Sequence, residues 1–250
     1  MNRVQQELAP WVNEAGDEDS PVSLAVCRPL ADGHDSALFV PLHYEPNYAY
    51  PLLVWLHGPR DSQQQLMRIM PLVSMRNFVG VAPRGPLEHR ATSALATTWS
   101  WSDDEASLST AEQRVTGAIE LTRRRLNIAP RRVFLAGYST GGTLALRLAM
   151  AHPQRFAGVI SLGGRFPTGG SPLRRLGEAR GVPILLACGQ TSREYPQADV
   201  CSDLRLLHSG GMNVALRIYP CGDEISPLML PDMNRWIMDL VIGCPQAVQA

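Results

Sequence analysis

A serine at a sharp turn is the residue in this sequence whose setting points most directly to chemistry. Ser139 stands at the centre of residues 137–141, which read G-x-S-x-G. An apolar run at 133–136 precedes this pattern, and residues 143–150 follow it with helical spacing. A crowded strand-to-helix turn requires glycine at both flanking positions, because a Cβ there would clash. The sequence therefore predicts a nucleophile elbow that lifts the Ser139 hydroxyl above the end of a buried strand.

A serine hydroxyl attacks an ester only with help from neighbouring groups. It needs a base that takes its proton and hydrogen-bond donors that meet the developing oxyanion. All 23 cationic side chains of this chain are arginines, so chemistry that depends on a lysine, such as Ser–Lys catalysis or a Schiff base, is excluded. Histidine is the ordinary base, and the chain has six, none of which follows His208.

Composition narrows the class of protein. The chain has 250 residues and a formal net charge of zero, so no basic excess indicates nucleic acid or an acidic membrane surface as a partner. Five scattered cysteines lack metal-ligand spacing, and we expect neither a metal nor a cofactor. No apolar run approaches the roughly 20 residues of a membrane span, and residues 1–20 lack a secretory pattern. A cytoplasmic location is the default expectation.

Strand and helix patterns alternate along most of the chain, after a leader or surface helix at 1–20. Strands are predicted at 23–28, 37–42, 51–56, 78–82, 133–136, 156–162, 182–188 and 214–219, with a turn at 31–33 joining the first two. Helices are predicted at 66–75, 109–126, 143–150, 199–209 and 232–242, with a loop at 84–107 and a loop plus a short helix at 163–179.

Another local signal in this pattern is a helix start. Ser109 and Glu112 form an S-x-x-E capping box, and Arg123, Arg124 and Arg125 suit the negative end of that helix. Together the elements predict an α/β fold, with a mostly parallel sheet, helices on both faces and two antiparallel N-terminal strands. Residues 21–250 are expected to form a single domain.

The order of these elements resembles the carboxylesterase/phospholipase/acyl-protein thioesterase group of α/β hydrolases over roughly residues 35–240. The local patterns that carry the resemblance are L-H-G at 56–58, an aromatic residue at Trp99 or Trp101, H-P-x-x-F at 152–156, G-x-x-S at 189–192 and Y-P-C-G-D-E-I at 219–225. The resemblance implies an α/β-hydrolase fold and a serine site for esters or thioesters, with Ser139 as the nucleophile.

The resemblance also implies that two members of the catalytic triad are replaced. Ser192 stands where the group has its aspartate, and Asp223 stands where it has its histidine. Glu194 lies two residues beyond the acid position, but it would orient a histidine that the chain lacks. Loss of the base in a serine triad lowers turnover by about a million-fold.

The oxyanion hole implied by the resemblance is incomplete as well. The backbone N–H of Thr140 supplies one donor, but the second falls on Pro59, which has no N–H. Arg60 replaces a glycine of the group, and its mobile guanidinium is the available substitute donor. Losing one such donor costs roughly a hundred- to a thousand-fold. The expected pocket residues are His57, Gly58, Pro59, Arg60, Tyr138, Thr140, Trp99 and Trp101.

His89 is the one candidate for a relocated base, because it lies in the loop expected at the carboxyl end of the sheet. In the group, the residue at His57 shapes the oxyanion loop and its ring does not serve the serine. The remaining histidines are expected away from the serine, in the N-terminal strands, below the elbow helix or on the surface: His34, His43, His152 and His208.

Three interpretations remain open. In the first, the chain is a catalytically silent or strongly impaired relative, a pseudoenzyme whose pocket binds a small acyl or ester ligand or whose fold binds a partner. In the second, it is an active carboxylesterase or thioesterase that uses His89 or Asp223 as base, although a carboxylate of ordinary pKa, about 4, is a weak base. In the third, a partner binds the arginine-rich segment 163–179. The alternative for this segment is a solvated charged loop without a partner. The ligand and the oligomeric state stay open.

Overall fold

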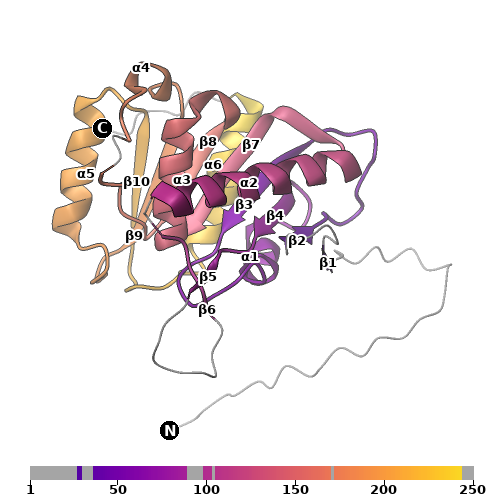
Figure 1. Ribbon diagram of the computed structural model, residues 1–250, viewed down its shortest axis with the longest axis horizontal. Helices are drawn as coiled ribbons and strands as arrows, with labels where there is room; N and C mark the ends of the chain where they lie inside the picture. Colours follow the sequence, from indigo (N-terminus) through magenta and orange to yellow (C-terminus); the bar gives the residue numbers. More distant parts are fainter. Residues whose placement is uncertain (1–26, 30–35, 89–97, 103–104, 170–171, 244–250) are drawn as a thin grey trace, which may run out of the picture.

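A single eight-stranded sheet runs through the centre of the molecule. The computed structural model describes residues 27–29, 36–88, 98–102, 105–169 and 172–243, and the predicted leader at 1–20 and turn at 31–33 lie outside them. The strand order is β1-β2-β4-β3-β7-β8-β9-β10 (Figure 1). The strands are β1 Cys27–Pro29, β2 Ser36–Phe39, β3 Tyr50–Leu56, β4 Val79–Pro83, β7 Ile128–Tyr138, β8 Gly158–Leu162, β9 Ile184–Gly189 and β10 Val214–Tyr219.

The sheet is mixed at one edge and parallel elsewhere. β1 pairs antiparallel with β2, and β2 pairs antiparallel with β4. The other neighbouring pairs, from β4–β3 through β9–β10, are parallel. The two antiparallel N-terminal strands and the mostly parallel sheet confirm the prediction.

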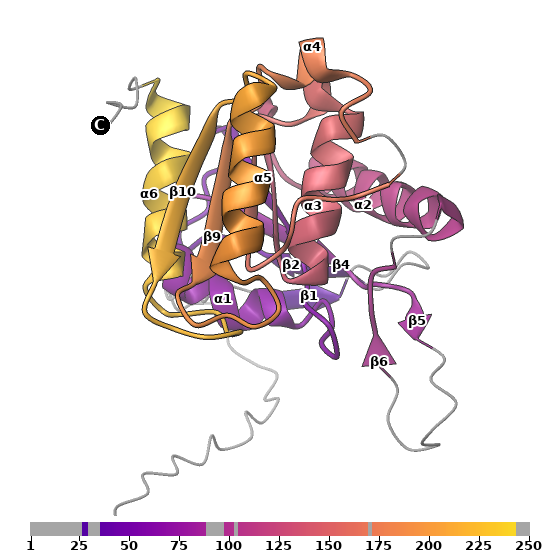
Figure 2. The ribbon, with the colours of Figure 1, turned by 90° about the vertical axis from the view of Figure 1, so that its left-hand side faces the viewer.

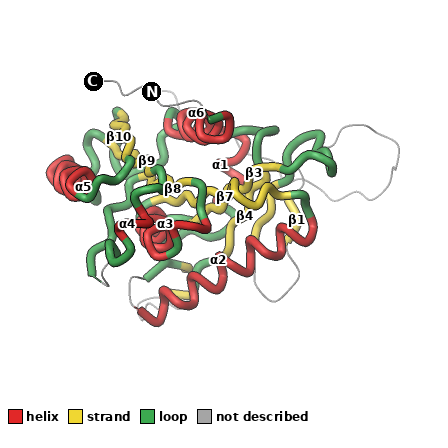
Figure 3. Tube along the Cα trace, turned by 90° about the horizontal axis from the view of Figure 1, so that it is seen from above, coloured by secondary structure: helices red, strands yellow, loops and turns green. Residues whose placement is uncertain are grey.

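Helices cover both faces of this sheet, as Figure 3 shows from above. Contacts with the two hydrophobic cores place α2, α3, α4 and α5 on one face and α1 and α6 on the other. The helices are α1 Gln65–Val73, α2 Glu105–Arg125, α3 Thr140–Ala151, α4 Leu176–Ala179, α5 Gln197–Ser209 and α6 Met229–Ile242, with a 3₁₀ turn, η1, at Pro153–Arg155.

The burial of the central strand β3 explains why its sequence is apolar without interruption. All seven of its residues are buried. Successive side chains of a strand point to opposite faces, so Leu52 and Val54 enter one core while Leu53 and Trp55 enter the other. A strand covered on both faces has no solvent side on which polar residues would alternate.

Two predicted boundaries are wrong in an informative way. α2 begins at Glu105, so Ser109 and Glu112 lie inside the helix and do not cap its start. Their i,i+3 spacing fits a helix interior as well as a capping box, which explains the error. α6 begins at Met229, three residues earlier than predicted, because Pro231 is tolerated in the first turn of a helix.

The predicted loop at 84–107 also contains structure of its own. Leu87–Glu88 and Thr98–Trp99, β5 and β6, pair antiparallel in a separate two-stranded sheet (Figure 2). Strands of two residues give almost no periodic signal, which is why the sequence did not reveal them.

Candidate active site at the elbow serine

The carboxyl ends of the parallel strands bring the predicted site residues to one edge of the sheet. The loops after β3, β7, β8, β9 and β10 all leave from this edge. Ligands of open α/β sheets bind outside the carboxyl ends of the strands. Ser139, Ser192 and Asp223 each follow one of these strands, so the fold gathers them at the place where such a site is expected.

Ser139 occupies a strained turn between β7 and α3. Its backbone has φ 48° and ψ −117°, a region that non-glycine residues adopt at a cost of about 1–3 kcal/mol. A Cβ on Gly137 would lie 2.4 Å from the carbonyl carbon of Gly141, and a Cβ on Gly141 would lie 2.2 Å from the backbone oxygen of Leu56. The N–H of Ser139 donates to the backbone oxygen of Leu162 over 2.9 Å. The crowding that the sequence predicted is therefore present.

The partner of the Ser139 hydroxyl is a carboxylate. The hydroxyl donates a hydrogen bond to Oε2 of Glu194 over 3.1 Å. Ser139 is 9% exposed, whereas Glu194, in the loop after β9, is exposed. From the sequence, Glu194 was expected only as a group that would orient a histidine. The signal that could have found this contact was its position two residues beyond Ser192, on a loop that must face the elbow.

Ser192 and Asp223 do meet, but they bond to each other and to the loop backbone. The Ser192 hydroxyl donates to Oδ1 of Asp223 over 2.5 Å. The backbone N–H groups of Arg193 and Glu194 donate to the same carboxylate over 3.0 and 3.1 Å. The Ser192 hydrogen bond, followed by these two backbone bonds, lowers the pKa of Asp223. Asp223 thus acts as an acceptor that joins the loops after β9 and β10.

Tyr138 forms a wall between the oxyanion loop and the loop after β10. Its hydroxyl donates to the backbone oxygen of Asp223 over 2.5 Å. Its ring lies against Gly58, where a Cβ would come within 2.5 Å of the ring. Burial first, and then the negative charges of Glu194 and Asp223, raise the pKa of Tyr138 to about 12. The phenol therefore stays neutral and keeps its proton for the bridge.

The imidazole of His57 is already engaged inside the protein. The ring is fully buried, and its Nε2 accepts a hydrogen bond from the N–H of Gly85 over 3.0 Å. The tautomer that accepts at Nε2 carries a proton at Nδ1, which lies 2.8 Å from the backbone oxygen of Gly58. Burial lowers the pKa of His57, which favours this neutral form. The ring thus holds the loop after β3 against the segment after β4.

The loop after β3, for which the family resemblance implies the oxyanion role, has little donor capacity left in its first residues. The N–H of Gly58 donates to Oε1 of Gln65 over 3.2 Å, and that oxygen also accepts from Trp55 over 2.8 Å. Pro59 has no N–H. Arg60 follows with φ 58°, in the left-handed region that suits the glycine implied at this position by the family resemblance. The amide of Gly58 is therefore occupied, and Pro59 has no amide hydrogen to donate.

A pocket of about 210 Å³ lies beside the elbow serine. It is lined by Trp101, Ser139, Thr140, Thr143, Gly163 and Arg165. Of the two tryptophans proposed from the sequence, Trp101 lines this pocket, while Trp99 lies in β6 with the Arg84 guanidinium 5.0 Å from its ring centroid. Thr143, Gly163 and Arg165 are not among the pocket residues that the sequence predicted.

Arg165 connects the loops after β8 and β9 at this pocket. Its Nε donates to the backbone oxygen of Glu194 over 2.6 Å, and its guanidinium pairs with Asp199 over 2.8 Å. The hydroxyl of Thr143 donates to the backbone oxygen of Arg165 over 2.9 Å. Arg165 thereby holds the backbone of Glu194 near Ser139, a role that the compositional view of a solvated arginine-rich loop did not anticipate.

The histidines of the described residues do not serve Ser139. His43 and His208 are exposed, and His152 follows α3, where its Nε2 lies 2.8 Å from a carboxylate oxygen of Glu112. His34 and His89, including the proposed relocated base, lie outside the described residues. Within the part of the chain that the structure describes, the hydroxyl of Ser139 bonds to a carboxylate, and no imidazole is bonded to it.

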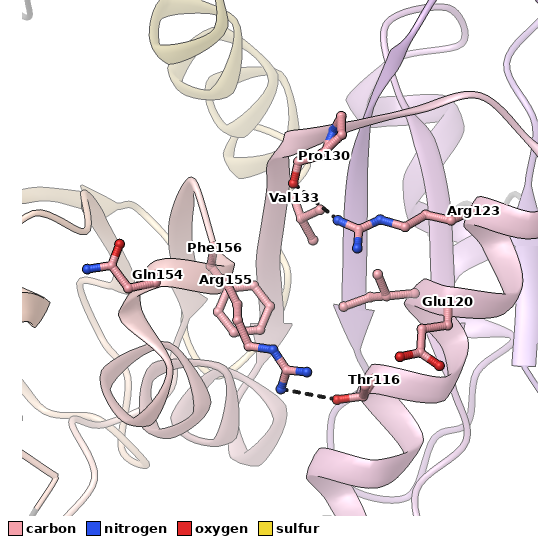
Figure 4. Close-up of a pocket in the computed structure, with 9 residues that line it drawn as sticks. Thr116, Glu120, Arg123, Pro130, Val133, Gln154, Arg155 and Phe156 are labelled. Carbon is pink, nitrogen blue, oxygen red and sulfur yellow. Dashed lines mark hydrogen bonds between the residues drawn. The ribbon is translucent and has the colours of Figure 1, made fainter.

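A second hollow, of about 230 Å³, lies at the opposite end of β7 from Ser139. Figure 4 shows it between α2, the start of β7 and the segment after α3. Arg123 donates to the backbone oxygen of Pro130 over 3.1 Å, and Arg155 donates to Thr116 over 3.4 Å (Figure 4). These cations are engaged in contacts of the fold, and the hollow contains none of the groups that meet at the elbow.

Two further features concern ligands and membranes. The described residues contain no group of three or more histidine, cysteine, aspartate or glutamate side chains arranged to hold a metal ion. None of the described helices combines the length and the apolar character that crossing a membrane requires.

Comparison with known families identifies the scaffold on which this site is built. The sequence profile described as Phospholipase/Carboxylesterase matches residues 45–240. The chain belongs to this family. The match covers the elbow, the oxyanion loop and both loops that hold Ser192, Glu194 and Asp223.

Individual relatives agree with this assignment. Carboxylesterase SOBER1 of Arabidopsis thaliana is 26% identical over 206 residues, which are 76% of this chain and 90% of the relative. Its crystal structure matches with a TM-score of 0.65 and 25% identity, covering 77% of this chain and all of that one, which confirms the α/β-hydrolase fold.

Two other relatives are similar over shorter stretches. NocK of Nocardia uniformis subsp. tsuyamanensis, which carries an esterase name, is 33% identical over 151 residues. That stretch is 58% of this chain but spans only 41% of the relative. A probable inactive carboxylesterase of Oryza sativa subsp. japonica is 26% identical over 110 residues, 43% of this chain and 45% of the relative.

Proposed function

We propose that this family member is silent, or strongly impaired, as a serine esterase, and that its pocket binds a small acyl or ester ligand. The observation that carries the proposal is the bond from the Ser139 hydroxyl to Glu194 in place of an imidazole. A carboxylate is a much weaker base than an imidazole. Loss of the triad base lowers turnover by about a million-fold, and the roughly 10³–10⁴-fold acceleration that remains comes largely from the oxyanion hole and binding.

The surroundings of Asp223 support the same conclusion. An active enzyme that used Asp223 as base would need this carboxylate at the serine. Its oxygens instead accept from Ser192 and from two backbone N–H groups, and these bonds lower its pKa and weaken it further as a base. His89, the other base considered for an active enzyme, lies outside the described residues and is tested by the same assay.

The oxyanion loop provides independent support. The amide of Gly58 is bonded to Gln65, and Pro59 has none, so the second oxyanion donor expected in the family is missing from this stretch. Removal of one donor costs about a hundred- to a thousand-fold in turnover. The pocket itself, with the buried Ser139 hydroxyl and the start of α3, remains large enough to admit a small molecule.

The test compares the unmodified chain with Ser139→Ala. Both are assayed with p-nitrophenyl butyrate from pH 5 to pH 9, and both are exposed to a fluorophosphonate that labels activated serines. We expect equal background rates and no labelling that depends on Ser139. Ser209→Ala, which removes an exposed hydroxyl remote from the elbow, serves as the control. Turnover that disappears only in Ser139→Ala would refute the proposal, whichever group acts as base.

A second experiment restores the missing groups. Ser192→Asp combined with Asp223→His places an acid and an imidazole at two positions whose side chains already touch. We expect ester hydrolysis to rise about a hundredfold or more over the parent, because only part of the triad's contribution is recovered. The single variant Asp223→His is the matched control, and the gain must vanish when Ser139→Ala is added. If no gain appears, adding Pro59→Gly tests whether the oxyanion loop is the remaining obstacle.

A further inference from the structure

The two edges of the central sheet differ in how they are protected from pairing with another chain. At one edge, the described part of β1 has three residues and ends with Pro29, which has no N–H. At the other edge, β10 spans Val214–Tyr219 without a proline and pairs with β9 residue for residue, without a bulge. Short strands, prolines and bulges are devices that prevent pairing at an edge, and β10 has none of these three. Figure 2, which faces this edge, shows β10 between α6 and α5.

The hydrogen bonds with β9 determine which backbone groups of β10 point outward. The N–H of Ile184 in β9 donates to the backbone oxygen of Asn213, the residue before β10, over 2.9 Å. Backbone groups of successive residues in a strand point alternately to its two sides, so the odd-numbered residues of β10 bond to β9. The N–H and C=O groups of Val214, Leu216 and Ile218 therefore point away from the sheet, and they have no strand partner among the described residues.

These outward groups match those of a second β10 that runs antiparallel to the first. When Leu216 lies on a two-fold axis, it faces Leu216 of the second copy, and Val214 faces Ile218 of that copy. Each such pair exchanges two N–H···O bonds. A two-fold contact uses the same surface on both chains and is the commonest symmetry of soluble oligomers. This register uses every outward N–H and C=O group of the strand.

The apolar side chains on one face of β10 complement one another in this register. Val214 and Leu216 pack against the core on the side of α5. Ile218 lies on the same face by strand alternation, and it is 50% exposed, which is unusual for an isoleucine. Pairing places Ile218 across from Val214 of the second copy, so the exposed apolar surface of both chains leaves water.

The charge on the other face of β10 selects the same register. Arg217 lies on the side of α6, where its guanidinium pairs with Asp232 over 3.1 Å. In the register described, Arg217 faces the small side chain of Ala215 of the second copy. A pair centred on Arg217 would oppose two guanidinium groups, which is destabilising. A pair centred on Ala215 would place Ile218 opposite Met212, which lies before the strand.

We propose that a second copy of this chain binds along β10, with Leu216 at the two-fold axis, so that two eight-stranded sheets become one continuous sheet. The occupant is a second copy because the edge complements itself, both in its apolar row and in the place of Arg217, the one charged residue of the strand. This inference goes beyond the proposed function, and it does not depend on whether Ser139 reacts.

The first test measures the mass of the full chain by sedimentation velocity and by light scattering over a range of protein concentrations. We expect the mass to rise from that of one chain toward twice that value as the concentration increases. A single species with the mass of one chain, up to the solubility limit of the protein, would overturn the inference. Assemblies that grow beyond two chains would also overturn it, because a two-fold contact closes.

Amide hydrogen exchange, followed by NMR, locates the contact on β10. The N–H groups of Ala215 and Arg217 bond to β9, so we expect them to be protected at every concentration. The N–H groups of Leu216 and Ile218 should exchange rapidly in dilute protein and become protected as the dimer forms. A dimer in which Leu216 and Ile218 keep the exchange rates of the dilute protein would place the interface elsewhere and contradict the inference.

A matched pair of variants completes the test. Ile218→Lys puts a charge on the edge, opposite Val214 of the second copy, and leaves the bonds to β9 in place. We expect the dissociation constant of the dimer to rise about tenfold or more, since the change occurs twice in the contact. Leu72→Lys makes a similar change at a 53% exposed position on α1 and should alter the constant less than about twofold. Equal effects of the two variants would contradict the role of β10.

Discussion

The elbow between β7 and α3 and the loops after β9 and β10 are held in place by different kinds of contact. At the elbow, backbone atoms fill the space where a Cβ of Gly137 or Gly141 would lie, and the serine between them is 9% exposed. In the two loops, exposed or half-buried side chains bond to one another, with Asp223 accepting from Ser192. The elbow is fixed by the core. In the two loops the backbone is also closely packed, since a Cβ on Gly189 would lie 2.2 Å from the backbone oxygen of Gly222, but the side chains of Ser192 and Asp223 are held by polar contacts at the surface.

This difference explains how the proposed function can arise, with a nucleophile position kept and its base lost. The turn at Ser139 is built by the packing of β7 and α3 on β3, and that packing does not depend on whether the hydroxyl reacts. Residues on the exposed loops can change with small effects on folding, because they bury little surface. Catalytic groups supplied by such loops are therefore the part of a serine site that a stable fold can lose.

The largest expected effect concerns the elbow. Gly141→Ala would place a Cβ 2.2 Å from the backbone oxygen of Leu56, and backbone cannot move aside as a flexible side chain can. We expect the free energy of unfolding to fall by about 3 kcal/mol or more, or the chain not to fold. Urea denaturation followed by circular dichroism measures the change.

The matched control lies in the middle of α2. A Cβ added at Gly117 would have nothing within 4 Å, and the φ of this glycine is not positive. Gly117→Ala should therefore raise the free energy of unfolding, by about 0.5–1 kcal/mol, because alanine favours a helix over glycine. Similar losses in the two variants would show that the elbow is not held by the crowding described above.

The next effect is the dependence of stability on pH through His57. Burial lowers its pKa below the ordinary 6.5, so the unfolded chain takes up a proton under conditions in which the folded chain does not. Stability is then complete above pH 6.5 and falls as the pH drops toward the lowered pKa, by at most about 1.4 kcal/mol per pH unit. NMR of the His57 ring should show a protonation midpoint below pH 6.5. A midpoint at or above 6.5 would contradict this.

A smaller effect is expected in the loops after β9 and β10. Asp223→Asn removes the charge that accepts from Ser192 and from the N–H groups of Arg193 and Glu194. We expect these two amides to exchange with solvent severalfold faster, while the elbow amides keep their rates. In the unmodified chain, the amides of Arg193 and Glu194 should lose their protection from exchange when Asp223 becomes protonated. Because the pKa of Asp223 is lowered, this happens only as the pH falls through that lowered value.

Glu224→Gln is the matched control for this variant, because it removes a neighbouring exposed carboxylate. Its amide exchange rates in the loop after β9 should equal those of the unmodified chain. If Glu224→Gln and Asp223→Asn accelerate exchange equally, general surface charge, and not the Asp223 bonds, protects the loop.

The smallest effect belongs to the surface beside the hollow in Figure 4. Glu112 contacts His152 over 2.8 Å and Arg155 over 3.4 Å, and all three side chains are at least 29% exposed. Glu112→Gln should change the free energy of unfolding by less than about 1 kcal/mol, since exposed ion pairs contribute little. A loss comparable with that of Gly141→Ala would mean that this surface is as strongly constrained as the elbow.

The elements of the fold could be predicted where burial leaves a clear pattern. β3 differs from its predicted bounds by one residue, because a strand inside a sheet needs continuous apolar side chains. β10 matches its predicted bounds at 214–219, although it is an edge strand whose side chains are mostly half-buried. The start of α2 was missed because Ser109 and Glu112 fit two helical positions equally well. The short strands at 87–88 and 98–99 were missed because two residues carry no period.

The sequence alone determined the elbow, since G-x-S-x-G between an apolar strand and a helix leaves few other conformations. It also put Ser192 and Asp223 at the positions where the family resemblance implies an acid and a base. Only the tertiary structure decided what surrounds Ser139. Three residues near the serine come from distant parts of the chain: Glu194, Arg165 and Trp101. They lie 26 to 55 residues from Ser139 in the sequence. Local patterns specify how a chain bends, whereas distances between separate loops follow from how the strands that carry them pack into one sheet.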